Sequence, residues 1–168
     1  PLIRVLHPQM GIDKETGELL WERTIADPDN SETITAAPLI VKDLVMTGVA
    51  GGEYGIRGWL AATDLNSGKE VWRTYTIPGP GEPGHETWKD DHEAWKTGGG
   101  PTWVTGSYDA ALNLIYWGVG NPGPDWDNAY RPGDNLYTES VLALDATTGE
   151  IKWHFQYTPN DPYDYDSV

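Results

Sequence analysis

The chain has 168 residues, the length of a single domain, and it is rich in Trp (9), Tyr (9), Gly (20) and Pro (13). Its net charge of −15 argues against nucleic-acid binding, which requires a basic surface, but suits a metal ligand set or a basic protein partner. Without cysteine, this segment can form neither disulfides nor thiolate metal sites.

The abundance of aromatic and turn-forming residues favours short strands and structured loops over helices. No initiator Met, signal peptide or apolar run of membrane length can be recognised. We therefore expect the chain to be a fragment of a longer protein.

Short apolar runs bounded by Gly, Asn, Asp or Pro predict β-strands along the chain. No segment shows sustained apolar spacing of three and four residues, so helix content should be low. Long loops are expected between strands at 77–100, 120–135 and 158–168, and functional sites are usually found in such loops. The expected strands cover 18–23, 37–49, 58–63, 69–75, 112–119, 140–144 and 150–157.

One spaced pattern, Asp-x3-Gly-x3-Trp, occurs three times. An Asp that accepts backbone N–H groups, followed by a Gly that tolerates positive φ, predicts a hairpin turn. The Trp beyond the turn can pack over the neighbouring unit. The repeats start 51 and 81 residues apart, which indicates blades or solenoid coils stacked side by side. The three copies are Asp13, Gly17 and Trp21; Asp64, Gly68 and Trp72; and Asp145, Gly149 and Trp153.

Four loop side chains carry oxygen atoms suited to a hard cation such as Ca²⁺ or a lanthanide. Glu53 lies in the glycine-rich segment 50–55, where the backbone can approach a ligand closely, and Asn121 follows a strand end. Asp164 and Asp166 alternate with tyrosines, so in an extended segment both would point to the same side. Taken singly, each of the four also fits a turn cap or a solvated acid.

Other features have simpler interpretations. His85 and His92 have no third ligand at zinc-like spacing, which favours a solvated pair. The glycine run 98–100 is followed by Thr102 and Trp103 rather than Lys-Ser/Thr, so it is not a phosphate loop. Trp103 could offer an indole face to a flat ligand, or be one more packed Trp.

In order and spacing, these segments resemble the pyrroloquinoline-quinone (PQQ) dependent alcohol dehydrogenases, the methanol/ethanol dehydrogenase family. The match spans essentially the whole chain, and the repeats resemble the tryptophan-docking motifs of that family. The resemblance implies that residues 1–168 are part of one all-β domain, an interior piece of an eight-bladed β-propeller. The segments that carry it are 51–59, 95–100, 120–124, 131–135 and 161–166.

The resemblance also assigns metal ligands. Glu53 and Asn121 match the side chains that hold the metal ion beside the quinone. Asp164 matches the catalytic aspartate, which we also place at the metal. Asp166 matches the additional carboxylate of lanthanide-using members, so we expect a lanthanide ion, with Ca²⁺ as the alternative. An additional carboxylate favours a trivalent ion of higher coordination number.

Cofactor contacts follow in the same way. Trp103 matches the indole beneath the PQQ ring, Thr35 matches a hydroxyl that bonds the cofactor, and Gly51 and Gly52 are expected beside it. Two further positions depart from the family pattern, since Ala50 and Pro101 stand where Ser and Thr are common, and each departure removes a hydroxyl from the expected site.

The resemblance implies an enzyme that oxidises a primary alcohol to the aldehyde through PQQ and a bound metal ion, and passes electrons to cytochrome c. It also implies a periplasmic location and allows a homodimer. The alternative is a non-catalytic propeller that serves as a binding module or scaffold. If Glu53 and Asn121 lay on opposite faces, the enzyme hypothesis would be excluded.

Overall fold

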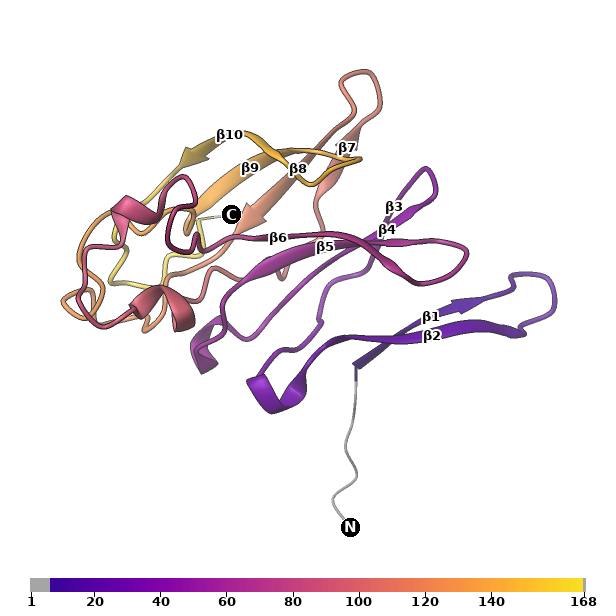
Figure 1. The fold of residues 1–168 in the computed structure, drawn as a ribbon, viewed down its shortest axis with the longest axis horizontal. Coiled ribbons are helices and arrows are strands. Elements are labelled where there is room, and N and C mark those ends of the chain that lie inside the picture. Colours follow the sequence, from indigo (N-terminus) through magenta and orange to yellow (C-terminus); the bar gives the residue numbers. More distant parts are fainter. Residues whose placement is uncertain (1–6, 168) are drawn as a thin grey trace, which may run out of the picture.

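The computed structural model describes residues 7–167, which form antiparallel β-sheets joined by loops (Figure 1). A two-stranded sheet is followed by two four-stranded sheets, each with its strands in chain order. The 3₁₀ helices of the described residues are too short to cross a membrane. The helices are η1 (Pro28–Asn30), η2 (Gly52–Tyr54), η3 (His85–Thr87) and η4 (Ala94–Thr97).

The sheets are successive units of one architecture, and the all-β prediction is confirmed. The first holds β1 (His7–Ile12) and β2 (Leu19–Ala26). The second holds β3 (Leu39–Val41), β4 (Leu44–Gly48), β5 (Trp59–Asp64) and β6 (Glu70–Tyr75). The third holds β7 (Ser107–Asp109), β8 (Leu114–Val119), β9 (Ser140–Asp145) and β10 (Ile151–Gln156).

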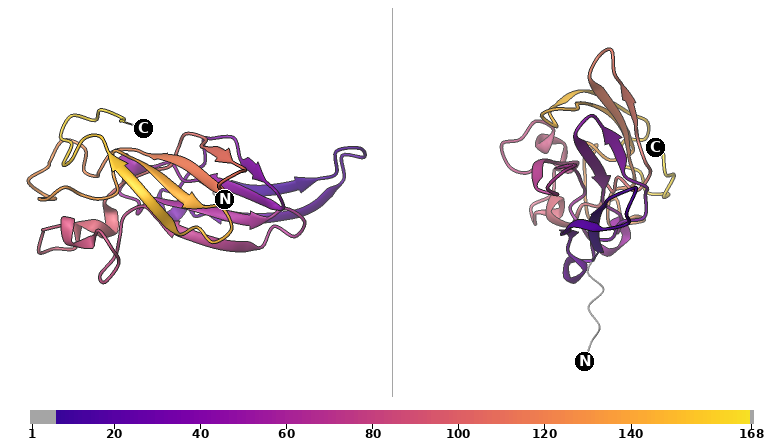
Figure 2. Two further views of the ribbon diagram at one scale, coloured as in Figure 1. Left: turned by 90° about the horizontal axis from the view of Figure 1, so that it is seen from above. Right: turned by 90° about the vertical axis from the view of Figure 1, so that its right-hand side faces the viewer.

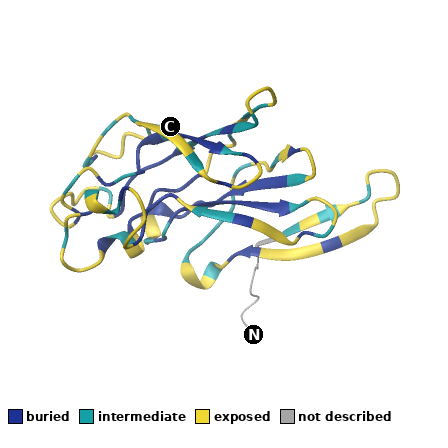
Figure 3. Ribbon diagram, turned by 45° about the horizontal axis from the view of Figure 1, so that its top comes forward, coloured by how far each residue is buried: buried dark blue, intermediate teal, exposed yellow. Residues whose placement is uncertain are grey.

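The core lies between the two four-stranded sheets, which pack face to face as blades. Buried side chains of β4 and β5, such as Met46 and Leu60, join one cluster with Ile115, Trp117 and Leu142 of β8 and β9. Figure 3 shows this buried interior, with exposed residues in the loops and turns and along the outer strands such as β2 and β10. Burial of apolar surface between blades is therefore a main stabilising contribution.

The three repeats form equivalent hairpin turns, joining β1 to β2, β5 to β6 and β9 to β10. In the first, the Asp13 carboxylate accepts the N–H groups of Glu15 and Thr16 at 2.9 and 2.8 Å, and Gly17 has a φ of 75°. The Thr16 N–H is the main cause of the lowered pKa of Asp13. The predicted turn chemistry is confirmed.

Each of the second and third turns also receives a Trp from the preceding unit. The indole Nε1 of Trp21 donates to the Leu65 carbonyl at 2.8 Å, and a Cβ at Gly68 would lie 2.4 Å from the Trp21 ring. Trp72 likewise donates to the Ala146 carbonyl at 3.2 Å and covers the glycine of the third turn. Blade stacking through the repeats is therefore observed twice.

The antiparallel order places alternate connections at opposite ends of the strands. The tight turns, including all three repeats, lie at one end. At the other end, which we call the loop end, lie the connections β2–β3, β4–β5, β6–β7 and β8–β9 and the segment after β10 (Figures 1 and 2). Every candidate site residue belongs to the loop end, so the repeats build the scaffold and stand away from the site.

One strand prediction needs correction, and two further strands are missed by the sequence analysis. The expected strand 37–49 is the hairpin β3–β4, which turns at Lys42 with a φ of 54°. Strand β1 is not predicted because it contains Pro and Gly and lacks alternation, and its pairing with β2 is irregular. Strand β7 is not predicted because its three residues are mostly polar. In each case pairing with a neighbour overrides a weak local pattern.

Candidate functional site

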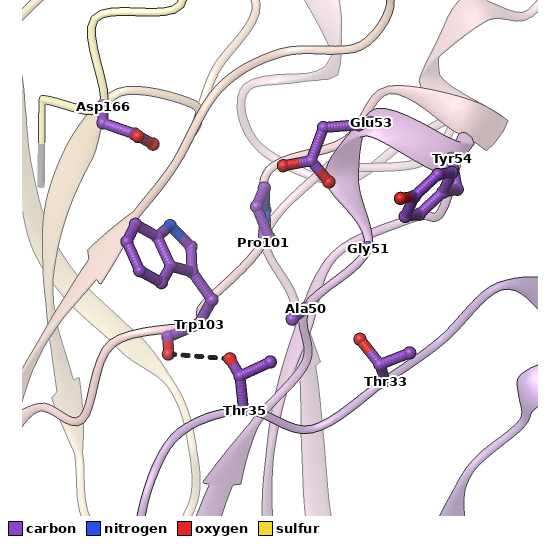
Figure 4. Close-up of a pocket in the computed structure, with 9 residues that line it drawn as sticks. All are labelled: Thr33, Thr35, Ala50, Gly51, Glu53, Tyr54, Pro101, Trp103 and Asp166. Carbon is purple, nitrogen blue, oxygen red and sulfur yellow. Dashed lines mark hydrogen bonds between the residues drawn. The ribbon is translucent and has the colours of Figure 1, made fainter.

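A pocket of about 310 Å³ opens where four segments at the loop end of the strands meet (Figure 4). The β2–β3 and β4–β5 connections form one side, and the β6–β7 connection and the end of the described chain form the other. The carboxylates of Glu53 and Asp166 point toward one another across the pocket. The lining residues are Thr33, Thr35, Ala50, Gly51, Glu53, Tyr54, Pro101, Trp103 and Asp166.

The indole of Trp103 forms a flat wall of this pocket, with 38% of its surface exposed. It lies close to Gly120, where a Cβ would be 3.2 Å from the indole Nε1, so glycine leaves room for the ring. The Thr35 hydroxyl donates to the Trp103 carbonyl at 3.4 Å. Both residues therefore stand together at the pocket.

Asn121 is buried behind the pocket and bonded to the segment that carries Asp166. Its Oδ1 accepts the Asp166 N–H at 3.0 Å, and its backbone carbonyl accepts the Gly100 N–H at 2.8 Å. A Cβ at Gly99 would lie 2.7 Å from the Asn121 carbonyl, and Gly99 has a φ of 72°. The glycine run thus brings the β6–β7 connection against the Asn121 backbone.

Asp164 and Asp166 do not lie in an extended segment, so that expectation is wrong. Both have positive φ, 61° and 51°, and the Asp161 carboxylate accepts the N–H groups of Tyr163 and Tyr165 at 2.9 and 2.8 Å. The buried Asp161 curls the segment into a compact loop, and such local side-chain bonds compete with strand formation. Asp166 lines the pocket, whereas Asp164 is exposed beside it.

Negative charge is concentrated around the pocket. Partial burial raises the pKa of Asp166 above its usual value, and the charges of Asp164 and Glu53 raise it further. The same three causes, burial, Asp164 and Glu53, raise the pKa of Asp125 in the β8–β9 connection. Asp125 is an acid of this region that sequence reasoning missed, because its loop offers no spacing signal.

The donor set fits a hard cation by its chemistry. Asn121 offers an amide oxygen and Glu53, Asp164 and Asp166 offer carboxylate oxygens, and a positive charge would relieve the crowding of the carboxylates. The Asn121 Oδ1 has a second lone pair beyond the one that accepts the Asp166 N–H. Within residues 7–167, no three Asp, Glu or His side chains stand close enough to form a metal-binding group in this arrangement.

The two glycines expected at the cofactor have packing roles. Gly51 lines the pocket with a φ of 117°, and a Cβ there would meet the Ser31 carbonyl at 2.3 Å. A Cβ at Gly52 would lie 2.8 Å from the Pro101 ring, and Gly52 is not among the pocket residues. Both glycines therefore allow the turn that carries Glu53 to pack tightly.

A fully buried arginine supports the loops from behind. The Arg131 guanidinium donates to the carbonyls of Pro124, Asp125 and Asp161 and to the Asn135 side chain. One planar group thus joins the loop of Asp125 to the loop that leads to Asp164. In the sequence, segment 131–135 carries only the family resemblance, because a lone Arg in a polar loop gives no sign of burial.

A family model decides the classification. The model for the glucose/ethanol/alcohol dehydrogenase β-propeller domain, PQQ, matches residues 15–168. The chain belongs to this PQQ family.

Relatives agree with that membership. The chain is 42% identical to the lanthanide-dependent methanol dehydrogenase of Methylacidiphilum fumariolicum and 40% identical to methanol dehydrogenase [cytochrome c] subunit 1 of Methylorubrum extorquens. These matches cover 95% and 94% of the chain but 29% and 28% of the relatives. A solved europium-containing methanol dehydrogenase superposes with a TM-score of 0.87 at 42% identity, over 95% of this chain and 30% of that one. The blades observed here are thus part of a PQQ-family propeller.

Proposed function

We propose that the complete protein containing this chain is a quinoprotein that oxidises a primary alcohol to the aldehyde. The observation that carries this proposal is the convergence of Glu53, Asn121 and Asp166, from three separate segments, beside the exposed indole of Trp103. A scaffold would have no need for this arrangement. The two relatives described above, which match over nearly the whole chain, are named as methanol dehydrogenases, and this supports the same reaction class.

The residues would hold the cofactor and metal as follows. Trp103 would provide a flat surface for the PQQ ring, Thr35 and Gly51 would border it, and Gly52 would support this wall by packing on Pro101. The metal ligands are Glu53, Asn121, Asp164 and Asp166. When bound, PQQ supplies a two-electron acceptor for the hydride of the alcohol, and the metal ion supplies a Lewis acid that polarises that acceptor.

Asp164 is the proposed catalytic base. Its carboxylate is exposed beside the pocket and accepts the hydroxyl proton as the alcohol is oxidised. The charge of Asp164 helps to raise the pKa values of Asp166 and Asp125, so this carboxylate acts on both neighbouring acids. The loop fixed by Asp161 and Arg131 holds this base near the ligands.

We propose a lanthanide as the resident metal, with Ca²⁺ as the alternative. Asp166 adds a carboxylate to the ligand set, and extra negative charge favours a trivalent ion. Among the relatives, one is named as lanthanide-dependent and one solved structure is named as europium-containing.

The partner and location are proposed from the relatives. One of them is named as the subunit of a methanol dehydrogenase that uses cytochrome c, so we propose a cytochrome c acceptor here. The net charge of −15 suits a basic cytochrome. A periplasmic location and a homodimer complete the proposal.

The metal assignment is tested with Asp166→Ala in the complete protein reconstituted with PQQ. Loss of a residue that merely supports a ligand costs about 10–100-fold in affinity, so loss of a ligand should lower La³⁺-dependent alcohol oxidation by at least about 100-fold. Asp43→Ala removes the same charge from the β3–β4 turn, which lies at the end of the strands away from the pocket, and should leave the rate unchanged. Equal activity of the wild type with Ca²⁺ alone would exclude the lanthanide preference.

A further inference from the structure

Glu139 is a buried acid that the proposed reaction does not use. It lies directly before β9, its exposed surface is 0%, and its φ is 51°, in the left-handed region. Burial of a carboxylate is unfavourable unless its oxygens are bonded. One oxygen, Oε1, has no hydrogen-bond partner among the described residues. A side chain kept for stability alone would be expected to satisfy both oxygens.

The bonds of Glu139 reach two of the three segments that carry the proposed metal ligands. Its N–H donates to the Gly120 carbonyl at 3.1 Å, and its Oε2 accepts the Ser167 N–H at 2.6 Å. Gly120 directly precedes Asn121, and Ser167 directly follows Asp166. Glu139 is therefore bonded to the residue before Asn121 and to the residue after Asp166.

Two adjacent amides at the end of the described chain are held by two side chains. The Asp166 N–H donates to Asn121 Oδ1 at 3.0 Å, and the Ser167 N–H donates to Glu139 Oε2. Fixing the peptide groups on both sides of the Asp166 Cα limits the directions in which its carboxylate can point. Both acceptors come from the β8–β9 connection, so their spacing is set by that connection.

We propose that Glu139 is a positioning residue for the metal site, whose buried carboxylate fixes the Asp166 backbone so that the Asp166 side chain faces Glu53 and Asn121. This inference rests on the proposed function, because it assumes that Asp166 is a metal ligand. The role requires one hydrogen-bond acceptor, which glutamine also provides, whereas methionine fills the same space without one.

The test uses the complete protein with Eu³⁺ as the probe. Luminescence decay in H₂O and D₂O gives the number of water molecules bound to the ion, and titration gives its affinity. In Glu139→Met we expect one additional bound water, because Asp166 no longer reaches the ion, and an affinity lower by about 10–100-fold. Glu139→Gln should match the wild type in both measurements, and Asp43→Ala serves as the control of equal charge change.

A double variant separates positioning from a general loss of structure. If Glu139 acts through Asp166, Glu139→Met should change neither hydration nor affinity further in an Asp166→Ala background. The proposal is overturned if Glu139→Met binds Eu³⁺ like the wild type, or if Glu139→Gln is as impaired as Glu139→Met. A wild type that binds no Eu³⁺ would instead overturn the proposed function, and this inference with it.

Discussion

Buried charged groups form a layer directly behind the pocket. Arg131, Asp161 and Glu139 each bond backbone groups of the loops that present the pocket acids. Burial lowers the pKa of Arg131, and the surrounding acids, Asp161 and Asp125 first among them, raise it. Since leaving a buried polar group without its hydrogen-bond partner costs about 1–3 kcal/mol, and more for a charged group, these residues should tolerate substitution less well than the exposed acids.

Glu139 should give the apo protein a measurable pH dependence. Burial raises its pKa above the unfolded value, so between the two values the folded state binds more protons than the unfolded state. Stability should therefore fall as pH rises from the unfolded pKa to the folded pKa. Because Glu139→Gln removes this ionisation, the variant should gain thermal stability relative to wild type as the pH rises from the unfolded pKa of Glu, about 4.3, toward neutrality.

Thermal unfolding of both proteins at each pH, without metal, measures this difference. The other acids with raised pKa, Asp125 and Asp166, are present in both proteins, so the substitution removes the ionisation of Glu139 alone. A difference between wild type and variant that does not change with pH would contradict the account.

At the scale of elements, the turns whose shape depends on nearby residues could be predicted from the sequence, whereas the loops whose shape depends on distant residues could not. The hairpin turns were predictable because their chemistry is local: an Asp, a Gly of positive φ and a Trp at fixed spacing. The loop of Asp164 and Asp166 was not, because its shape depends on Asp161 and on Arg131, which lies 30 residues earlier. The family resemblance located the pocket residues, but the groups behind them leave no periodic pattern in the sequence.

Gly149→Ala should test the stacking of blades through the repeats. Gly149 has a φ of 74°, and a Cβ there would lie 2.5 Å from the Trp72 ring. Gly81 has a φ of 85°, and no atom lies within 4 Å of the position that a Cβ would take, so Gly81→Ala isolates the backbone cost of about 1–2 kcal/mol. We expect Gly149→Ala to destabilise the complete protein by about 1–3 kcal/mol more, in denaturant unfolding, because the Trp must shift. Equal effects of the two variants would contradict docking of Trp72 on this turn.

At the scale of the whole molecule, the described residues contain two blades and the last two strands of a preceding unit. Trp21 and Trp72 are buried on the turns that follow them, whereas Trp153 of the third repeat is 46% exposed. The chain spans less than a third of the relatives it matches. These observations support the expectation that this chain is one piece of a larger propeller.

The central claim is that this pocket belongs to a PQQ- and metal-dependent alcohol dehydrogenase. Its most direct test is a dye-linked alcohol oxidation assay of the complete protein, with PQQ and La³⁺ supplied together or singly, and with Ca²⁺ in place of La³⁺. We predict oxidation of a primary alcohol when PQQ and La³⁺ are both present, and none when either is omitted. A folded protein that binds PQQ yet oxidises no alcohol with either metal would contradict the account and favour the scaffold alternative.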